Sequence, residues 1–228
     1  PIHDICGLLE SKGVKVYAVP VESDAFFGLS VADDDGGPAV VVNAWERIPV
    51  ETWIFSAAHE LGHLLMHLAA YDVTEQDESL DEEKEANVFA SHFLMPEKAF
   101  RKEWTDTAGH AFFDRVMKVK RIFRVSWRTV LYRLDDQSVW ARFSRDYTAQ
   151  TGNSVKKHTE PDGVDASFFQ QDAGPEPAKL DAVDFKQDRL AALVRRAVES
   201  EKITLARGAE ILELSLVEMR QLASSWAS

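Results

Sequence analysis

The sequence predicts an α+β fold in which a small antiparallel β-sheet packs on a central helix and on a second helix, followed by a helical C-terminal region. Three observations predict it. Short runs rich in β-branched residues come before residue 44, the segment 50–68 is apolar with helical spacing, and two later segments have helix-turn-helix-like patterns. The 228 residues suffice for one substantial core and a small additional domain.

The N-terminal segment predicts one short helix and three strands. Residues 4–12 have a helical pattern that ends near Gly13, and residues 14–19 alternate as a strand does. Residues 27–32 and 39–43 flank a run of Asp, Gly and Pro residues, which predicts a hairpin. An edge strand of such a sheet can hold an extended peptide by backbone pairing.

The segment 50–68 predicts the central helix, with Pro49 at its start. It contains His59-Glu60-Leu61-Gly62-His63. Two histidines four residues apart on a helix leave the same face, about 6 Å apart along the axis. On such an apolar helix each would need a buried partner, so a metal ion explains the pair better than two separately satisfied core histidines.

The spacing H-E-x-x-H is typical of zinc peptidases. Imidazole suits zinc and several other divalent metals, and a catalytic zinc site has three protein ligands and one water molecule. His59 and His63 are therefore predicted metal ligands. Glu60 lies beside the open position, where its carboxylate can act as the general base.

The third ligand is expected on a second helix, predicted over residues 80–96. A carboxylate there would complete the site, and a polar side chain one turn further would orient a ligand histidine. Glu83 followed by Asn87 fits this layout, and Glu85 is the competing ligand. His67 continues the face of His59 and His63. A fourth protein ligand would displace the water, so His67 is expected to make supporting hydrogen bonds.

The rest of the chain predicts helices separated by an irregular segment. Residues 116–134 have helix-turn-helix character, with Ser126 capping the second helix. This segment either packs behind the site with its basic side chains in water or docks DNA or a repressor, and the acidic balance of the chain favours packing. In the following irregular segment, Phe168 and Phe169 are expected to anchor it to a neighbouring element.

A second helix-turn-helix-like unit is predicted near the C-terminus, with Thr204 and Ser215 as helix caps. Its basic and acidic residues nearly cancel, which favours protein contact over DNA contact. The predicted parts are a metallopeptidase domain (1–110), a helix-turn-helix-like region (111–147), a linker or irregular segment (148–186) and a C-terminal helical domain (187–228).

Composition narrows the functional classes. A net charge of −12 argues against coating nucleic acid, since that binding depends on Lys and Arg at phosphates. The single cysteine, Cys6, excludes an intrachain disulfide framework and fits a reducing compartment, so we expect a cytoplasmic protein. No apolar run reaches membrane-spanning length, and no membrane partner is expected. The chain begins with Pro1, as a processed or excised form would.

Three stretches together resemble the ImmA/IrrE family of bacterial metallopeptidases. They are His59-Glu60-Leu61-Gly62-His63-Leu64-Leu65-Met66-His67, Glu83-Lys84-Glu85-Ala86-Asn87-Val88-Phe89-Ala90 and Phe93-Leu94-Met95-Pro96. The resemblance covers residues 1 to about 135 and is far more specific than H-E-x-x-H alone. It implies a zinc site with ligands at His59, His63 and Glu83, and Glu60 as the base.

The resemblance also implies a function. Members of the family typically cut a helix-turn-helix repressor, which relieves repression of transcription during stress or induction of mobile elements. The expected activity is therefore that of a zinc endopeptidase acting on such a repressor or on an antitoxin-like regulator. The alternative is a non-proteolytic regulator that binds DNA or a repressor and has a structural or vestigial metal site. Direct DNA binding is disfavoured by the charge balance.

Overall fold

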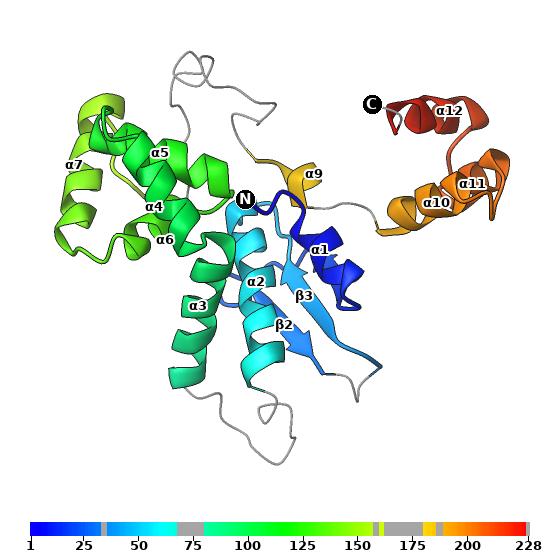
Figure 1. The fold of residues 1–228 in the computed structure, drawn as a ribbon, viewed down its shortest axis with the longest axis horizontal. Helices are drawn as coiled ribbons and strands as arrows, with labels where there is room; N and C mark the ends of the chain where they lie inside the picture. Colours follow the sequence, from blue (N-terminus) through cyan, green and yellow to red (C-terminus); the bar gives the residue numbers. More distant parts are fainter. Residues whose placement is uncertain (33–35, 68–79, 157–159, 162–179, 186–188, 227–228) are drawn as a thin grey trace. The chain divides into compact units, whose positions relative to one another are not determined.

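The computed structural model describes residues 1–32, 36–67, 80–156, 160–161, 180–185 and 189–226. The chain divides into two compact units, Pro1–Phe185 and Lys186–Ser228. The first unit contains the sheet and most of the helices, as Figure 1 shows. The α+β fold class predicted from the sequence is confirmed. No helix in the described part of the chain combines the length and hydropathy needed to cross a bilayer.

The N-terminal elements are helix α1 (Ile5–Ser11) and a three-stranded sheet in the order β1-β3-β2. Strands β2 (Gly28–Val31) and β3 (Ala39–Asn43) form the predicted antiparallel hairpin. Strand β1 (Lys15–Val19) pairs with β3 in parallel, so the sheet is mixed and the expectation of a purely antiparallel sheet is wrong in this detail. The reason is topological: β2 returns the chain, and β3 then runs beside β1 in the same direction.

Helix α2 (Val50–Met66) is the central element of the first unit. Pro49 precedes it, and the backbone N–H of His67 donates to the carbonyl oxygen of His63 at its C-terminus. Ten of its 17 residues are buried. The helix lies between the sheet and helix α3 (Leu80–Leu94), as Figure 1 shows. This position explains why the helix is apolar on nearly all sides.

The helices after α3 complete the core behind α2. Helix α3 ends at Leu94, two residues before Pro96, because proline disfavours continuation of a helix. Helix α4 (Glu97–Asp106) begins directly after Pro96. Helix α5 (Phe112–Phe123) ends at Arg124 in the left-handed conformation, and Ser126 caps α6 (Trp127–Arg133) as predicted. In α7 (Ser138–Thr151) the ring of Phe143 stacks on Trp127, with centroids 4.6 Å apart. The apolar faces of α5 and α6 belong to the main core.

Two pieces of the predicted linker pack into the first unit. Phe185, at the end of α9 (Ala182–Phe185), is 1% exposed and meets the ring of Trp53 edge-on. The Cys6 thiol donates to the carbonyl oxygen of Phe185, and Arg124 pairs with Asp184. Phe185 thus contacts the core, whereas the predicted anchors at 168 and 169 lie outside the described residues.

Glu160 is the second such piece, and it joins a buried cluster of charges. Lys120 Nζ lies 2.6 Å from Glu51 Oε1 and 3.0 Å from Glu160 Oε2. The backbone N–H of Trp127 also donates to Glu160 Oε2. The expectation that the basic residues of α5 lie in water is therefore wrong for Lys120. Two buried carboxylates share one lysine, which leaves an excess negative charge when both are ionised.

Replacing Glu160 by glutamine should change how stability depends on pH. Burial raises the pKa of the Glu160 carboxyl; Lys120 opposes that rise and Glu51 adds to it. Above the ordinary value of 4.5, the folded state therefore binds more protons than the unfolded state, and stability is lost as the pH rises toward the raised pKa. Urea unfolding should show E160Q gaining on the wild type as the pH rises above 4.5. A difference in unfolding free energy between E160Q and the wild type that stays constant with pH would contradict this. The control is Glu46→Gln, because Glu46 is exposed.

The second unit is a small bundle of α10 (Arg189–Glu199), α11 (Leu205–Ile211) and α12 (Leu216–Ser225). The predicted caps are present: Thr204 accepts from the backbone N–H of Arg207, and Ser215 forms a capping box with Glu218. Val194, Ala209 and Met219 form its core. The unit therefore has a hydrophobic core of its own, distinct from that of the first unit.

Candidate metal centre

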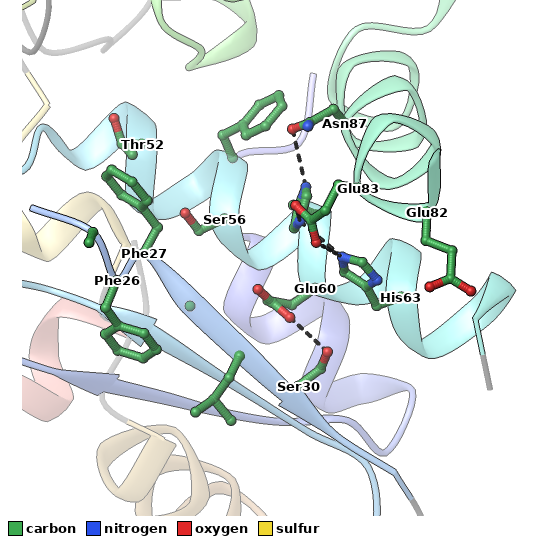
Figure 2. Close-up of a pocket in the computed structure, with 15 residues that line it drawn as sticks. Phe26, Phe27, Ser30, Thr52, Ser56, Glu60, His63, Glu82, Glu83 and Asn87 are labelled. Atoms are coloured by element: carbon green, nitrogen blue, oxygen red, sulfur yellow. Dashed lines mark hydrogen bonds and ion pairs between the residues drawn. The ribbon is translucent and has the colours of Figure 1, made fainter. Parts of the chain in front are cut away.

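Three side chains from α2 and α3 converge on one point. His59 Nε2 lies 3.0 Å from His63 Nε2 and 3.4 Å from Glu83 Oε2, and His63 Nε2 lies 3.0 Å from Glu83 Oε1. In the described part of the chain, these three residues form the group of His, Cys, Asp and Glu side chains whose ligand atoms are close enough to hold a metal ion. Figure 2 shows Glu83 reaching from α3 toward His63 on α2.

The spacing of these atoms fits a tetrahedral zinc site. Ligands about 2.0–2.1 Å from a tetrahedral ion are about 3.3 Å from one another. The two histidine nitrogens are 3.0 Å apart, close to that value; Glu83 lies 3.0 Å from His63 through Oε1 and 3.4 Å from His59 through its other oxygen, Oε2. One ligand atom from each residue can be chosen so that all three lie within 4.8 Å of one another. Two imidazoles and one carboxylate also match the ligands of known catalytic zinc sites, in which a fourth position is left for water. The residues present therefore fit zinc.

Burial favours the neutral imidazole of His59, which is the form that binds a metal ion. Desolvation lowers the pKa of His59, Glu83 opposes this, and the neighbouring His63 lowers it further. A lowered pKa keeps the imidazole neutral at neutral pH, and a metal ligand must be neutral imidazole. His59 Nδ1 lies 3.2 Å from Asn87 Oδ1, where it can donate a hydrogen bond. Its Nε2 then carries the lone pair that faces His63 and Glu83.

The two carboxylates that compete as third ligand lie in different places. Glu83 contacts both histidines, whereas Glu85 Oε2 lies 3.1 Å from His67 Nε2. His67 in turn contacts His63 through the two Nδ1 atoms, 3.1 Å apart. The geometry thus brings Glu83 together with His59 and His63, and the supporting contacts predicted for Asn87 and His67 are present. The role of Glu83 as a ligand stays a prediction.

Glu60 lines the same cavity as the three clustered residues and lies beside β2. It is buried, and its Oε2 accepts a hydrogen bond of 2.7 Å from Ser30 Oγ on β2. The cavity has a volume of about 650 Å³ and is lined by β2, the segment before it, α2 and α3. Figure 2 shows Phe26 and Phe27 at one end and Glu82 at the other. Glu60 can therefore meet a molecule that approaches the histidines through this cavity.

Two glycines allow the close approach of elements at the site. A Cβ atom on Gly62 would lie 3.1 Å from Phe89 Cδ1 and 3.3 Å from the Cα of Ala86, so the lack of a side chain lets α3 lie against α2. A Cβ atom on Gly28 would lie 3.1 Å from Glu60 Oε1. Neither these glycines nor Ser30 is among the site residues predicted from the sequence. A lone glycine inside an apolar helix is the one signal that the sequence offers for Gly62.

A family model described as the IrrE N-terminal-like domain, of the M78 peptidases, matches residues 9–135. That span is more than half of the chain. The chain belongs to this family. The resemblance to ImmA/IrrE proteins seen in the motifs is therefore confirmed, and the IrrE-like region contains the sheet, α2, α3 and the helix-turn-helix-like pair α5–α6. Membership shows a metallopeptidase-like domain, and all residues of the candidate metal centre lie within the matched span.

The other comparisons add little to the family assignment. No curated protein matches the chain. Among solved structures, a Mycobacterium tuberculosis transcriptional regulator is 20% identical with a TM-score of 0.39. That alignment covers 57% of this chain and 46% of the regulator, so it spans less than half of the regulator's length.

Proposed function

We propose that this protein is a zinc-dependent endopeptidase that cleaves a helix-turn-helix repressor or an antitoxin-like regulator and thereby relieves repression. The observation that carries the proposal is the cluster of His59, His63 and Glu83, with Glu60 facing the same cavity. Membership of an M78 peptidase family supports peptide hydrolysis. The repressor as substrate comes from the resemblance to ImmA/IrrE proteins, and a cytoplasmic location fits a chain with one buried cysteine.

The chain's own residues divide the chemistry between them. Zinc held by His59, His63 and Glu83 would supply the Lewis acid that polarises the scissile carbonyl and acidifies a water molecule. Glu60 takes a proton from the attacking water on its carboxylate and passes it to the nitrogen of the leaving amine. The hydrogen bond from Ser30 holds Glu60 in the cavity. Asn87 keeps the Nε2 lone pair of His59 directed toward the ligand cluster.

The cavity suits an extended segment of polypeptide. Strand β2 is at the edge of the sheet and pairs with β3 on one side, so its other side can pair with an added strand. Residues 25–30 line the cavity beside Glu60, which places this edge next to the reacting groups. Phe26, Phe27 and Phe55 provide an apolar wall for side chains. We therefore expect the scissile bond to lie in an unfolded or loop segment of the substrate.

The test is cleavage of a purified repressor by the full chain. The protein is stripped of metal with a chelator, reconstituted with zinc and incubated with a small helix-turn-helix repressor, for which one encoded beside its own gene would be the first choice. We expect one defined cut that requires zinc and stops when chelator is added. Zinc-independent binding to the repressor or its operator, with no cleavage of that repressor or of a panel of related ones, would support the non-proteolytic regulator instead.

A further inference from the structure

A chain of hydrogen-bonding groups leads away from the ligand cluster on the far side of His63. His63 Nδ1 lies 3.1 Å from His67 Nδ1, and His67 Nε2 lies 3.1 Å from Glu85 Oε2. The side chain of His67 is 4% exposed, whereas that of Glu85 is 65% exposed. This series of hydrogen bonds therefore joins the end of α2 to α3. It connects the buried ring of His67 with the exposed carboxylate of Glu85.

We propose that Glu85 and His67 are positioning residues that fix the tautomer and ring orientation of His63. This inference rests on the proposed function, because it gives His63 the role of a metal ligand. It assigns no metal contact to either positioning residue. Their effect is on which nitrogen of His63 carries its proton.

The direction of each hydrogen bond follows from the carboxylate. Ionised Glu85 can only accept, so His67 Nε2 must donate to it. A neutral His67 then has a lone pair on Nδ1, and His63 Nδ1 must donate to that lone pair. The remaining nitrogen, His63 Nε2, then has the lone pair that a metal ion held with His59 and Glu83 would bind; without the ion, the Glu83 carboxylate 3.0 Å away would accept a hydrogen bond from this nitrogen instead. Only this tautomer of His63 can bind a metal ion through Nε2.

The contacts of His67 separate this role from that of a fourth ligand. His67 meets the Nδ1 side of the His63 ring, whereas the ligand cluster lies on the Nε2 side. His67 is also not a solvent-exposed histidine on a helix surface, because its ring is buried and both ring nitrogens have partners. His59 receives the equivalent support in one step, from Asn87. The two histidines are therefore oriented by separate groups.

Zinc affinity measured by competition with a chelator tests the inference without any assay of cleavage. We expect His67→Ala to weaken zinc binding by about 10- to 100-fold, the usual cost of losing a group that orients a ligand. His67→Asn should recover much of this loss, because its amide oxygen can accept from His63 Nδ1. Glu85→Ala should lose less zinc affinity than His67→Ala, because the Glu85 carboxylate is exposed and water can take its place as the acceptor for His67 Nε2.

Asp81→Ala is the matched control for Glu85→Ala. It removes a carboxylate from the same end of α3, but its partner is Lys84 and not His67. We expect it to bind zinc as the wild type does. Equal loss in both variants would show a general effect of charge or of helix stability and would overturn the inference. So would equal affinities of His67→Ala and the wild type, although zinc-dependent cleavage would then still stand.

The proton on His63 provides a second readout. In the zinc-loaded full chain, nitrogen-proton correlation spectra of the imidazoles should show a His63 Nδ1–H signal that exchanges slowly with water in the wild type, because His67 accepts its hydrogen bond. In His67→Ala we expect this signal to broaden or disappear through exchange. A wild type that binds no zinc would sink the proposed function, whereas a wild type that binds zinc with an unchanged His63 Nδ1–H signal in His67→Ala would sink this inference alone.

Discussion

Glu60→Gln should abolish turnover while leaving zinc binding intact. Glutamine has nearly the same shape as glutamate but cannot accept the proton of the attacking water. General acid–base groups contribute about 10²- to 10⁴-fold to rate, and we expect a loss of that size in kcat. Glu60 is not in the ligand cluster, so its replacement removes no donor to the metal.

The measurement pairs single-turnover cleavage of the repressor with metal content after dialysis. Glu46→Gln is the matched control, because Glu46 is exposed and does not line the cavity. It should cleave at the wild-type rate. Wild-type cleavage by Glu60→Gln would remove Glu60 from the mechanism. Loss of zinc from this variant would instead show that the carboxylate holds the site together.

Glu83→Ala should lose zinc almost completely. The substitution removes one of three donors and leaves two imidazoles, which are too few for a stable zinc site. We expect the loss of affinity to exceed the roughly 100-fold upper limit for a group that only orients a ligand. Cleavage should fail for the same reason, even at zinc concentrations that saturate the wild type.

Glu85→Ala is the informative comparison, since Glu85 is the competing carboxylate and contacts His67, the residue that follows α2. Chelator competition on both variants gives two zinc dissociation constants. The contacts of Glu83 with His59 and His63 predict that Glu83→Ala has much the weaker affinity. The reverse order would make Glu85 the ligand and would require the ends of α2 and α3 to shift relative to one another.

The sequence predicts best what depends on local pattern. The hairpin follows from turn formers between two β-branched runs, and the caps at Ser126, Thr204 and Ser215 follow from side chains that satisfy free N–H groups. The close grouping of His59 and His63 follows from helical spacing. The step from Glu83 to Asn87 favours Glu83 over Glu85 as the ligand, and this choice stays a prediction; Glu83 contacts His59 and His63, whereas Glu85 contacts His67.

The features that local pattern does not predict depend on contacts between distant segments. The parallel pairing of β1 with β3 is set by the path of the chain through β2. Glu160 and Phe185 lie in stretches without periodicity, so their burial against Lys120 and Trp53 has no local signal. Ser30 likewise becomes relevant only when β2 is placed beside α2. These are tertiary contacts with separations of 24 residues or more.

The absence of a side chain at Gly62 makes the metal centre depend on a residue that is not itself a ligand. Donors on separate helices can drift apart without any change in the donors themselves, and here the spacing of the helices depends on bare backbone at one position. A mutation to alanine, harmless on most helices, would push against the Cα of Ala86 and the ring of Phe89. A constraint on the residue at position 62 would then be a constraint on the geometry of the metal centre.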